Sequence, residues 1–436
     1  MSTTSAAPPS TPAPGTVTGT LAPLLTRLLG DPLPIRIRAW DGSEAGPADA
    51  PTLTVTSRRA LRRLLWSPGE LGLAEAYITG DIDVEGDLGE GLRRIRQATR
   101  ERAGRPSLGP AERARALTAA LRLGAIGARP APPAGRAALR GSPHSKTRDR
   151  AAISHHYDLS NEFYALLLDP SMAYSCGYFT SEHATLAEAQ TAKLELICRK
   201  LGLAPGMRLL DVGCGWGSLA LYAAEHYRVE VTAVTLAERQ HAFVRARADA
   251  AGLSGRVTVR LCDYREIADG PYDAISSIEM GEHVGAAQYP AFARRLHRLL
   301  RPRGRLLVQQ MSRGAGAPGG GAFIETYIAP DMHMRPVGAT VALLEEAGLE
   351  VRQVEALREH YSRTVDAWRD TLELRWDTFT DLVGEESARV WRLYLVGASL
   401  AFSERRMGVD QLLTVRPGAD GTSGFPATPH AWYPAS

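Results

Sequence analysis

The 436-residue sequence has few cysteines and no long apolar runs. Its cysteines are scattered and form no Cys-x-x-Cys pair: Cys176, Cys198, Cys214 and Cys262. This spacing argues against a metal site and a disulfide framework, so we expect reduced thiols and no bound metal. No apolar run approaches the roughly 18 residues that span a bilayer, and residues 1–20 lack the regions of a signal peptide. We therefore expect a cytoplasmic protein.

The sequence also lacks a large net charge of either sign. The chain carries 51 basic and 48 acidic residues, a net charge of +3. This balance argues against nucleic acid as a partner. The hydrophobic content of 44% and charged content of 23% are typical of a globular protein. The length allows two or three domains of about 150 residues.

Changes of composition divide the chain into five parts. Residues 1–20 are rich in Ser, Thr, Ala, Pro and Gly, which predicts a disordered leader. Residues 21–99 predict a small α+β domain, and residues 100–147 predict a basic, mobile linker rich in Ala, Arg and Pro. Strands and helices alternate over 148–417, and the Gly/Ser/Pro-rich residues 418–436 predict a disordered tail.

Two short segments of the first domain alternate with a period of two. Residues 35–40 and 52–56 predict the strands of a hairpin with a long loop. Ser57 then begins a helix with four arginines on one side: Arg58, Arg59, Arg62 and Arg63. That side is either a solvated face or a contact for anionic lipid headgroups, where each charge contributes about 1 kcal/mol.

The larger domain has the pattern of an α/β protein. Five strands are expected, at 208–212, 230–234, 257–261, 272–277 and 305–310. Four helices are expected, at 186–201, 218–226, 236–251 and 289–300. Alternation at this spacing predicts a parallel, doubly wound sheet, and ligands of such sheets bind at the carboxyl ends of the strands.

A glycine-rich turn follows the first of these strands, in Arg208-Leu-Leu-Asp-Val-Gly-Cys-Gly-Trp-Gly217. Its glycines let the backbone turn sharply and approach a ligand closely. The spacing differs from the dinucleotide fingerprint. It resembles motif I of class I S-adenosylmethionine (SAM)-dependent methyltransferases. An ordinary strand-to-helix loop and a nucleotide site of another kind are the alternatives.

Four further segments narrow the resemblance to cyclopropane-fatty-acyl-phospholipid synthases. These segments are residues 153–164, 172–179, 277–285 and 360–368. The similarity covers roughly 150–417 in order, and residues 73–81 resemble the extra domain of the longer bacterial members. The resemblance implies a Rossmann-like class I methyltransferase fold with a small α+β N-terminal domain.

The same resemblance implies a SAM site. Its residues here are Tyr174, Ser175, Asp211, Gly213, Gly215, Thr235, Leu236, Gln240, Asp263 and Tyr264. In class I methyltransferases an acid at the position of Asp263 faces the adenine amino group. Thr235 departs from the class pattern, since many class I enzymes have an acid there for the ribose hydroxyls.

The family also implies a bicarbonate ion that acts as the base. Carried over, the residues that hold it are Cys176, Glu282 and Tyr361. Where the family often has His-x-Ile, this chain has Gln309-Gln310-Met311. The amide of Gln309 can donate a hydrogen bond to an anion but carries no positive charge, so anion affinity or base strength is expected to change. Glu279 is interpreted as a solvated neighbour of Glu282.

The chemistry explains the need for such a site. An isolated double bond is a weak nucleophile that attacks a methyl sulfonium only when held in line. The resulting carbocation requires a dry pocket and a small buried base. We therefore expect a SAM-dependent C-methyltransferase that acts on the cis double bond of unsaturated acyl chains of membrane phospholipids and forms a cyclopropane.

Three alternatives stay open at this point. The first is a methylene or methyl branch of the tuberculostearic type, made with a partner reductase. The second is a small-molecule methyltransferase of the same superfamily, and the third is a lipid-binding protein that has lost catalysis. In the favoured interpretation the N-terminal domain and the linker dock the enzyme on the inner face of the cell membrane, and a homodimer is compatible with the sequence.

Overall fold

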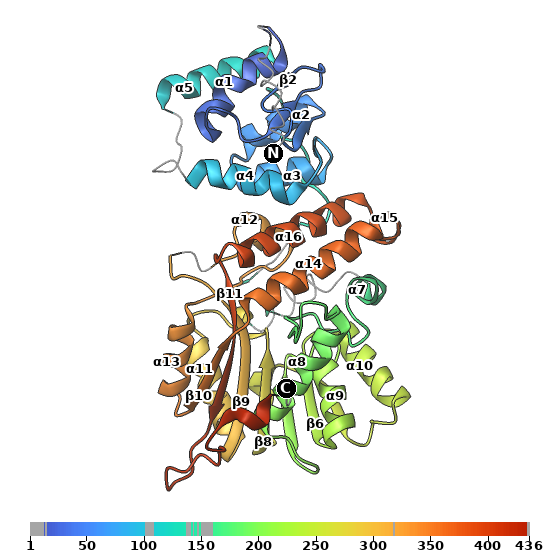
Figure 1. The fold of residues 1–436 in the computed structure, drawn as a ribbon, viewed down its shortest axis with the longest axis vertical. Coiled ribbons are helices and arrows are strands. Elements are labelled where there is room, and N and C mark those ends of the chain that lie inside the picture. The colour runs from blue at the N-terminus through green and yellow to red at the C-terminus, as the bar shows by residue number, and fades with distance from the viewer. Residues whose placement is uncertain are drawn as a thin grey trace, which may run out of the picture. The chain divides into compact units, whose positions relative to one another are not determined.

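The computed structural model describes residues 13, 15–100, 109–136, 141–142, 144–145, 148–149, 160–316 and 319–433. It has two units (Figure 1). Unit 1 comprises Met1–Arg136 and Gly384–Leu400, and unit 2 comprises Ala137–Val383 and Ala401–Ser436. Within the described ranges, no helix combines the length and the hydropathy needed to cross a membrane.

Unit 1 contains a four-stranded sheet in the order β2-β1-β3-β4. Its strands are β1 (Arg36–Arg38), β2 (Glu44–Ala45), β3 (Thr52–Val55) and β4 (Ile82–Glu85). β1 pairs parallel with β3 and antiparallel with β2, so the expected hairpin between residues 35–40 and 52–56 is wrong. The chain turns back directly after β1, through Gly42 at φ +78°, and the turn places β2 beside β1.

The helices of unit 1 surround this sheet. They are α1 (Val17–Leu29), α2 (Arg58–Trp66), α3 (Glu70–Ile78), α4 (Leu88–Arg100), α5 (Pro110–Arg122) and the first part of α16 (Glu385–Ser403). α1 begins within the predicted disordered leader, because Val17 N donates to Asp41 Oδ2 at 2.9 Å and Thr16 Oγ1 accepts from Gly19 N at 3.1 Å. Residues 1–12 and 14 of that leader lie outside the described residues.

Unit 1 also takes a segment from far along the sequence. The domain predicted over 148–417 is interrupted, since Gly384–Leu400 groups with unit 1. Arg389 of α16 accounts for this, because it donates to Tyr77 O at 3.2 Å and lies 3.3 Å from Asp83 Oδ2. Hydrogen bonds between residues so distant in sequence leave no periodic pattern that a single sequence displays.

The segment after α5, expected as part of a mobile linker, is attached to α2. Arg62 Nε donates to Ala125 O at 3.2 Å, Arg63 Nη1 to Ala131 O at 2.8 Å, and Trp66 Nε1 to Gly127 O at 3.1 Å. Side-chain donors thus satisfy carbonyls that no strand or helix pairs. Residues 101–108, 137–140, 143 and 146–147 of the expected linker lie outside the described residues.

The arginine face of α2 is partly an internal feature. Arg63 is 6% exposed, and its Nε lies 3.0 Å from Asp81 Oδ2. Arg59 Nε lies 2.9 Å from the other oxygen of Asp81, which is itself 1% exposed. A buried carboxylate requires such partners, so Arg59 and Arg63 do not form the free basic face that the helix pattern suggested.

Unit 2 is built on a seven-stranded sheet in the order β10-β11-β9-β8-β5-β6-β7. The strands are β5 (Arg208–Val212), β6 (Glu230–Thr235), β7 (Val257–Leu261), β8 (Tyr272–Ile278), β9 (Leu300–Ser312), β10 (Glu350–Ala356) and β11 (Gly408–Val415). The predicted doubly wound α/β fold and all five predicted strands are confirmed. β11 pairs antiparallel with both β9 and β10, so the sheet is mixed rather than wholly parallel.

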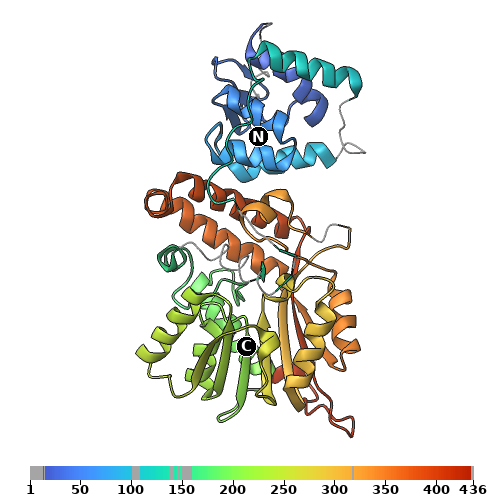
Figure 2. The same ribbon diagram turned by 180° about the vertical axis from the view of Figure 1, so that it is seen from behind.

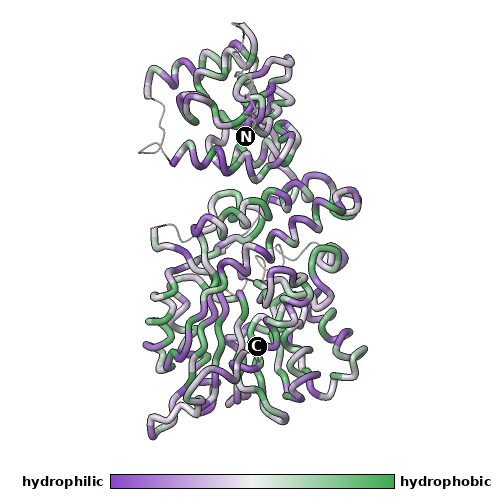
Figure 3. The backbone as a smooth tube through the Cα atoms, viewed as in Figure 1, coloured by the Kyte–Doolittle hydropathy of each residue, from purple (hydrophilic) through white to green (hydrophobic). Residues whose placement is uncertain are grey.

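Helices cover both faces of this sheet (Figures 1 and 2). The helices of unit 2 are α7 (Asn161–Leu167), α8 (Leu186–Leu201), α9 (Ser218–Tyr227), α10 (Glu238–Ala250), α11 (Tyr289–Leu299), α12 (Ala322–Tyr327), α13 (Val337–Glu346), α14 (Arg358–Leu374) and α15 (Trp376–Val383), of which α12, α14 and α15 lie beyond one edge of the sheet. Successive strand residues face opposite sides: Leu209 packs with α8 and α9, and Leu210 packs with α11 and α13. Hydrophobic residues recur along the strands in Figure 3 because both faces are buried.

The predicted disordered tail is ordered as far as residue 433. It ends in the 3-10 helix η3 (Pro429–Trp432), where Trp432 is 7% exposed and packs in the core cluster that contains α8. Phe425 lies edge-on to Trp432 at 5.9 Å, and the guanidinium of Arg305 lies 4.3 Å from the Phe425 ring. These aromatic contacts hold the tail against unit 2, although its composition suggests a flexible chain.

Candidate active site

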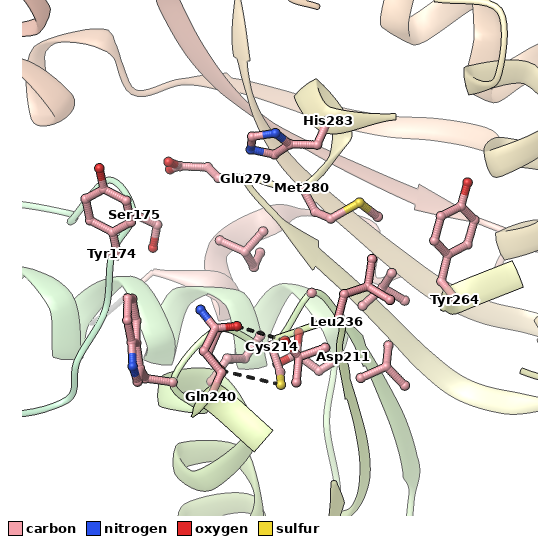
Figure 4. Close-up of a pocket in the computed structure, with 18 of the residues that line it drawn as sticks. Tyr174, Ser175, Asp211, Cys214, Leu236, Gln240, Tyr264, Glu279, Met280 and His283 are labelled. Carbon is pink, nitrogen blue, oxygen red and sulfur yellow. Dashed lines mark hydrogen bonds between the residues drawn. The ribbon is translucent and has the colours of Figure 1, made fainter. Parts of the chain in front are cut away.

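Unit 2 has a cavity at the carboxyl ends of its central strands (Figure 4). All ten residues expected to bind SAM line it: Tyr174, Ser175, Asp211, Gly213, Gly215, Thr235, Leu236, Gln240, Asp263 and Tyr264. They come from β5 and the turn after it, the end of β6 and the start of α10, the segment after β7, and the loop before α8. The doubly wound topology brings them together because parallel strands end at one edge of the sheet.

The glycine-rich turn between β5 and α9 forms the floor of this cavity. Gly215 has φ +53°, and a Cβ built there meets nothing within 4 Å, so the backbone is open to a ligand. Gly217 has φ +81°, and a Cβ there lies 2.7 Å from Val244 Cγ1 of α10. One glycine thus gives access to the backbone, and the other allows close packing on a helix.

Asp211 is the next-to-last residue of β5 and is 2% exposed. Its Oδ1 accepts a hydrogen bond from Ser276 Oγ at 2.8 Å. Burial raises the pKa of this carboxyl to about 6. The hydrogen bond from Ser276 and the charge of Lys193 lower the pKa and so offset part of the effect of burial. The carboxylate is therefore positioned by the sheet and lines the cavity beside the glycine turn.

The start of α10, after β6, provides a hydrogen-bond donor that no described residue uses. Thr235 Oγ1 donates to Gln240 Oε1 at 2.8 Å, which turns the amide nitrogen of Gln240 away from Thr235. That nitrogen is buried and has no hydrogen-bond partner among the described residues. A buried donor that lines a cavity is stabilised when a ligand supplies an acceptor. The ribose hydroxyls of SAM have such acceptors, so these residues fit the cofactor.

Asp263 follows β7 as expected, but a neighbour already engages it. Its Oδ1 accepts from the backbone N and the Nε of Arg265, both at 2.8 Å, and its Oδ2 accepts from Arg265 Nη2 at 2.6 Å. The same Nη2 donates to Asp149 Oδ2 at 2.9 Å. A carboxylate accepts several hydrogen bonds, so Asp263 retains capacity for an adenine amino group. Arg265 and Asp149 also line the cavity, and the sequence analysis did not identify them.

The loop that carries Tyr174 and Ser175 is fastened to α8. Gln190 Nε2 donates to Ser175 O at 2.8 Å, and Lys193 Nζ donates to Ser175 Oγ at 2.8 Å. Lys193 is 1% exposed, and burial lowers its pKa. It lines the cavity and was not predicted, because a lysine within an amphipathic helix normally reads as a surface residue.

Three of the five expected anion-site residues converge on Glu279. Cys176 N donates to Glu279 Oε1 at 2.8 Å, and Gln309 Nε2 donates to the same oxygen at 2.8 Å. The Tyr361 hydroxyl donates to Glu279 Oε2. Figure 4 shows the carboxylate pointing toward Tyr174, on the opposite side of the cavity from Tyr264. Burial raises the pKa of Glu279, and these three donors and the charge of Lys193 lower it again.

The other two expected residues form a separate pair. Glu282 lies in the 3-10 helix η2 (Gly281–His283), is 1% exposed, and accepts from Met311 N at 2.5 Å through its Oε1. Its Oε2 is buried without a hydrogen-bond partner in the described part of the chain. Burial and the charge of Glu279 raise the pKa of Glu282 to about 8. Glu282 is absent from the cavity lining, where Glu279 is present.

A sequence signal for Glu279 did exist. It directly follows β8, which ends at Ile278, and the carboxyl ends of strands are where ligands bind in this architecture. The interpretation of Glu279 as a solvated neighbour treated residues 277–285 as a single motif in which Glu282 is the functional residue. The tertiary fold instead separates Glu279 from Glu282, because the chain leaves β8 with Glu279 at φ +52°.

The orientation of the Gln309 amide follows from a chain of hydrogen bonds. Lys200 Nζ donates to Gln411 Oε1 at 2.8 Å, and Gln411 Nε2 donates to Gln309 Oε1 at 2.9 Å. The oxygen of Gln309 is thereby used, and its nitrogen faces Glu279. β11 supplies Gln411, so the missed strand is also part of the support for the site.

Comparisons with known proteins agree with this geometry. The family model for mycolic acid cyclopropane synthetase matches residues 144–412. A probable fatty acid methyltransferase of Pseudomonas putida is 36% identical over 409 residues, 92% of this chain and 96% of that protein. Tuberculostearic acid methyltransferase UfaA1 of Mycobacterium tuberculosis is 32% identical over 413 residues, 91% of each chain.

A solved structure gives the same result. The crystal structure of mycolic acid cyclopropane synthase CmaA1 complexed with SAH and CTAB has a TM-score of 0.58 and 34% identity, and the match covers 61% of this chain and 97% of that one. The glycine turn, the free donor of Gln240 and Asp263 lie where the fold places a nucleoside cofactor. The chain therefore belongs to the mycolic acid cyclopropane synthetase family and is a SAM-dependent methyltransferase.

Proposed function

We propose that this methyltransferase acts on the cis double bond of unsaturated fatty acyl chains in membrane phospholipids and forms a cyclopropane ring. The observation that carries the proposal is the match to a fatty acid methyltransferase along 92% of this chain. That match is too long to be confined to unit 2, whose two segments exclude residues 1–136 and 384–400. A similarity limited to unit 2, which contains the candidate SAM site, would favour a small-molecule substrate instead.

The residues of the cavity suit such a reaction. Gly215, Asp211 and Gln240 line the cavity and would hold SAM, which supplies an electrophilic methyl group when bound. The electron pair of the double bond would form the new bond to that methyl carbon while the methyl–sulfur bond breaks and leaves its electron pair on sulfur. A positive charge would remain on the other alkene carbon. The ring of Tyr174 lines the cavity, and aromatic faces attract a cation. Loss of one proton from the added methyl then allows its C–H electron pair to close the ring.

A methylene branch is the second candidate product. It forms when a hydride shift moves the positive charge before the same proton is lost. The 32% identity to a tuberculostearic acid methyltransferase and the presence of Gln309 support this alternative. A saturated methyl branch additionally requires a reductase as a partner, because the methylene group must gain two electrons and two protons.

The test is proton NMR of lipids from cells that express the chain and are supplied with oleate. Upfield cyclopropyl signals are expected, and they distinguish the ring from its methylene isomer, which has the same mass. Vinylidene signals would replace the first proposal by the second. Unchanged oleate, together with measurable SAM binding by the purified protein, would refute both and favour a substrate that is not a membrane lipid.

We further propose that unit 1 contacts the inner face of the cell membrane through exposed apolar side chains. Leu117 and Leu121 are 53% and 60% exposed and lie one turn apart on α5. Trp66 is 54% exposed, and Ile126 is 47% exposed beside it, where the Trp66 indole donates to Gly127 O. Positive charge on the same helices comes from Arg62 of α2 and from Arg113 and Arg115 of α5. Apolar groups with flanking arginines suit the headgroup region of an anionic bilayer.

The double variant Leu117→Asp/Leu121→Asp is expected to weaken binding to dioleoyl phosphatidylglycerol vesicles by ~10-fold or more, since each buried leucine contributes about 1.5–3 kcal/mol. Co-sedimentation at low salt measures this. Leu374→Asp is the matched control, because Leu374 is 85% exposed but belongs to unit 2. Equal binding by both variants, or none by the unaltered protein, would exclude this surface.

A further inference from the structure

We propose that Glu279 is the general base that removes the proton from the added methyl group, so that this chain needs no free bicarbonate ion. The inference rests on the proposed function, because the proton comes from the acyl substrate that the function names. It replaces the bicarbonate that the family resemblance implied with a carboxylate of the chain itself.

Three of the five residues expected to hold bicarbonate are already bound to Glu279. Cys176 N and Gln309 Nε2 each lie 2.8 Å from its Oε1, and the Tyr361 hydroxyl donates to its Oε2. A backbone N–H and a phenol have one hydrogen each, so a free anion would have to share both. It would also lie against the negative charge of Glu279, where two like charges in a poorly solvated site repel strongly. Bicarbonate therefore does not fit this donor set.

The surrounding residues keep these donors directed at Glu279. The oxygen of Gln309 accepts from Gln411 Nε2 at 2.9 Å, which leaves the nitrogen for Glu279. Burial raises the pKa of the Cys176 thiol well above its ordinary value, so the residue acts through its backbone N–H and not as a thiolate. No salt bridge to Glu279 occurs among the described residues, and Lys193, whose charge lowers the pKa of Glu279, donates its hydrogen bond to Ser175.

The backbone at Glu279 also indicates a functional constraint. Its φ of +52° is uncommon for a residue with a side chain, and it occurs at the carboxyl end of β8, on the cavity. Backbone strain of this kind concentrates at active sites, where the surrounding structure enforces it. Here it directs the carboxylate into the cavity that also holds Asp211 and the glycine turn.

The proton transfer balances without a further reactant. The C–H bond of the added methyl breaks, and its electron pair forms the ring-closing bond to the cationic carbon. The proton goes to a carboxylate oxygen of Glu279, so a cation and an anion become two neutral groups. When the product leaves, the neutral acid returns its proton to water. Burial, which raises the pKa of Glu279, favours acceptance of the proton in this step.

The first part of the test measures the full chain on dioleoyl phosphatidylglycerol vesicles in buffer purged of carbon dioxide. The turnover of the unaltered protein is expected to change less than about twofold when bicarbonate is added, because no site for the ion is free. A loss of turnover on purging, with saturable recovery by bicarbonate, would overturn the inference.

The second part is chemical rescue. Glu279→Gly removes the carboxylate and leaves the three donors free, and glycine adopts φ +52° without strain. This variant is expected to lose turnover and to regain ~10-fold or more with added bicarbonate or formate, which supply a base at the vacated position. Glu279→Gln, whose amide still fills that position, is expected to gain nothing. Thermal unfolding and SAM titration establish that both variants are folded.

The outcomes separate the inference from the proposed function. If the unaltered protein forms no product on vesicles, the proposed function fails before the variants are compared. If it forms product and Glu279→Gln matches its rate, the proposed function stands and the inference is wrong. Loss of turnover in Glu282→Gln with retention in Glu279→Gln would assign the base to Glu282 instead.

Discussion

Glu279→Gln is expected to lower kcat by about 10²–10⁴-fold, the range for loss of a general base. The dissociation constant for SAM is expected to change by no more than about tenfold, because the glycine turn, Thr235 and Gln240 are untouched. The amide keeps the size of the carboxylate and still accepts through its oxygen from Cys176 N and Gln309 Nε2. Single-turnover product formation and calorimetric SAM titration measure the two quantities separately.

Glu346→Gln is the control for this substitution, since Glu346 is an exposed residue at the end of α13. It is expected to match the unaltered protein in both measurements. A tenfold or greater weakening of SAM binding by Glu279→Gln, with kcat unchanged, would instead mean that Glu279 serves the cofactor and not the proton transfer.

The pH profile tests the same assignment. A base works only when deprotonated, and the pKa of Glu279 is raised above the ordinary 4.5 by burial. The rate should therefore fall as the pH decreases through a value above 4.5, and the fall should be absent in Glu279→Gln. The charged or titratable groups that face Glu279 are Lys193 of α8, Tyr361 of α14, the Cys176 thiol and Glu282 of η2. Tyr361→Phe should shift the fall to higher pH, because the lost hydroxyl stabilised the ionised carboxylate.

Trp368→Ala is expected to give the largest loss of stability. Trp368 is 0% exposed in α14, and its ring lies 5.2 Å from that of Tyr174 and 6.2 Å from that of Tyr361. Truncation of a buried tryptophan typically lowers the free energy of unfolding by about 3–5 kcal/mol. At about 2–4 °C per kcal/mol for a unit of this size, the midpoint of thermal unfolding should fall by roughly 6–20 °C.

The same substitution should also weaken SAM binding at temperatures where the protein is folded, because Tyr174 lines the cavity and loses its packing partner. Leu374→Ala, at the exposed end of the same helix, is the control and should change the free energy of unfolding by less than about 0.5 kcal/mol. An unchanged midpoint in Trp368→Ala would mean that this aromatic cluster does not support the site.

The fold of unit 2 was predictable because its signals are local. Buried strands such as β5 and β6 are short segments rich in Leu and Val, and amphipathic helices such as α8 lie between the strands and their neighbours in the sequence. β10 escaped prediction because charged and apolar residues are mixed along it. β11 escaped prediction because it follows the long helix α16. The predicted hairpin between residues 35–40 and 52–56 of unit 1 was wrong because strand pairing depends on contacts beyond the connecting loop.

The sequence by itself determined the ten residues expected to bind SAM, which line one cavity, since a strand, a glycine turn and the ends of the next strands lie in a fixed order along the chain. Only the tertiary structure decided which glutamate faces the cavity. Glu279 and Glu282 are three residues apart and chemically identical, and their separation depends on the φ of +52° at Glu279 and on donors from Cys176, Gln309 and Tyr361. Those donors come from three distant segments, so no pattern within residues 277–285 reveals where they converge.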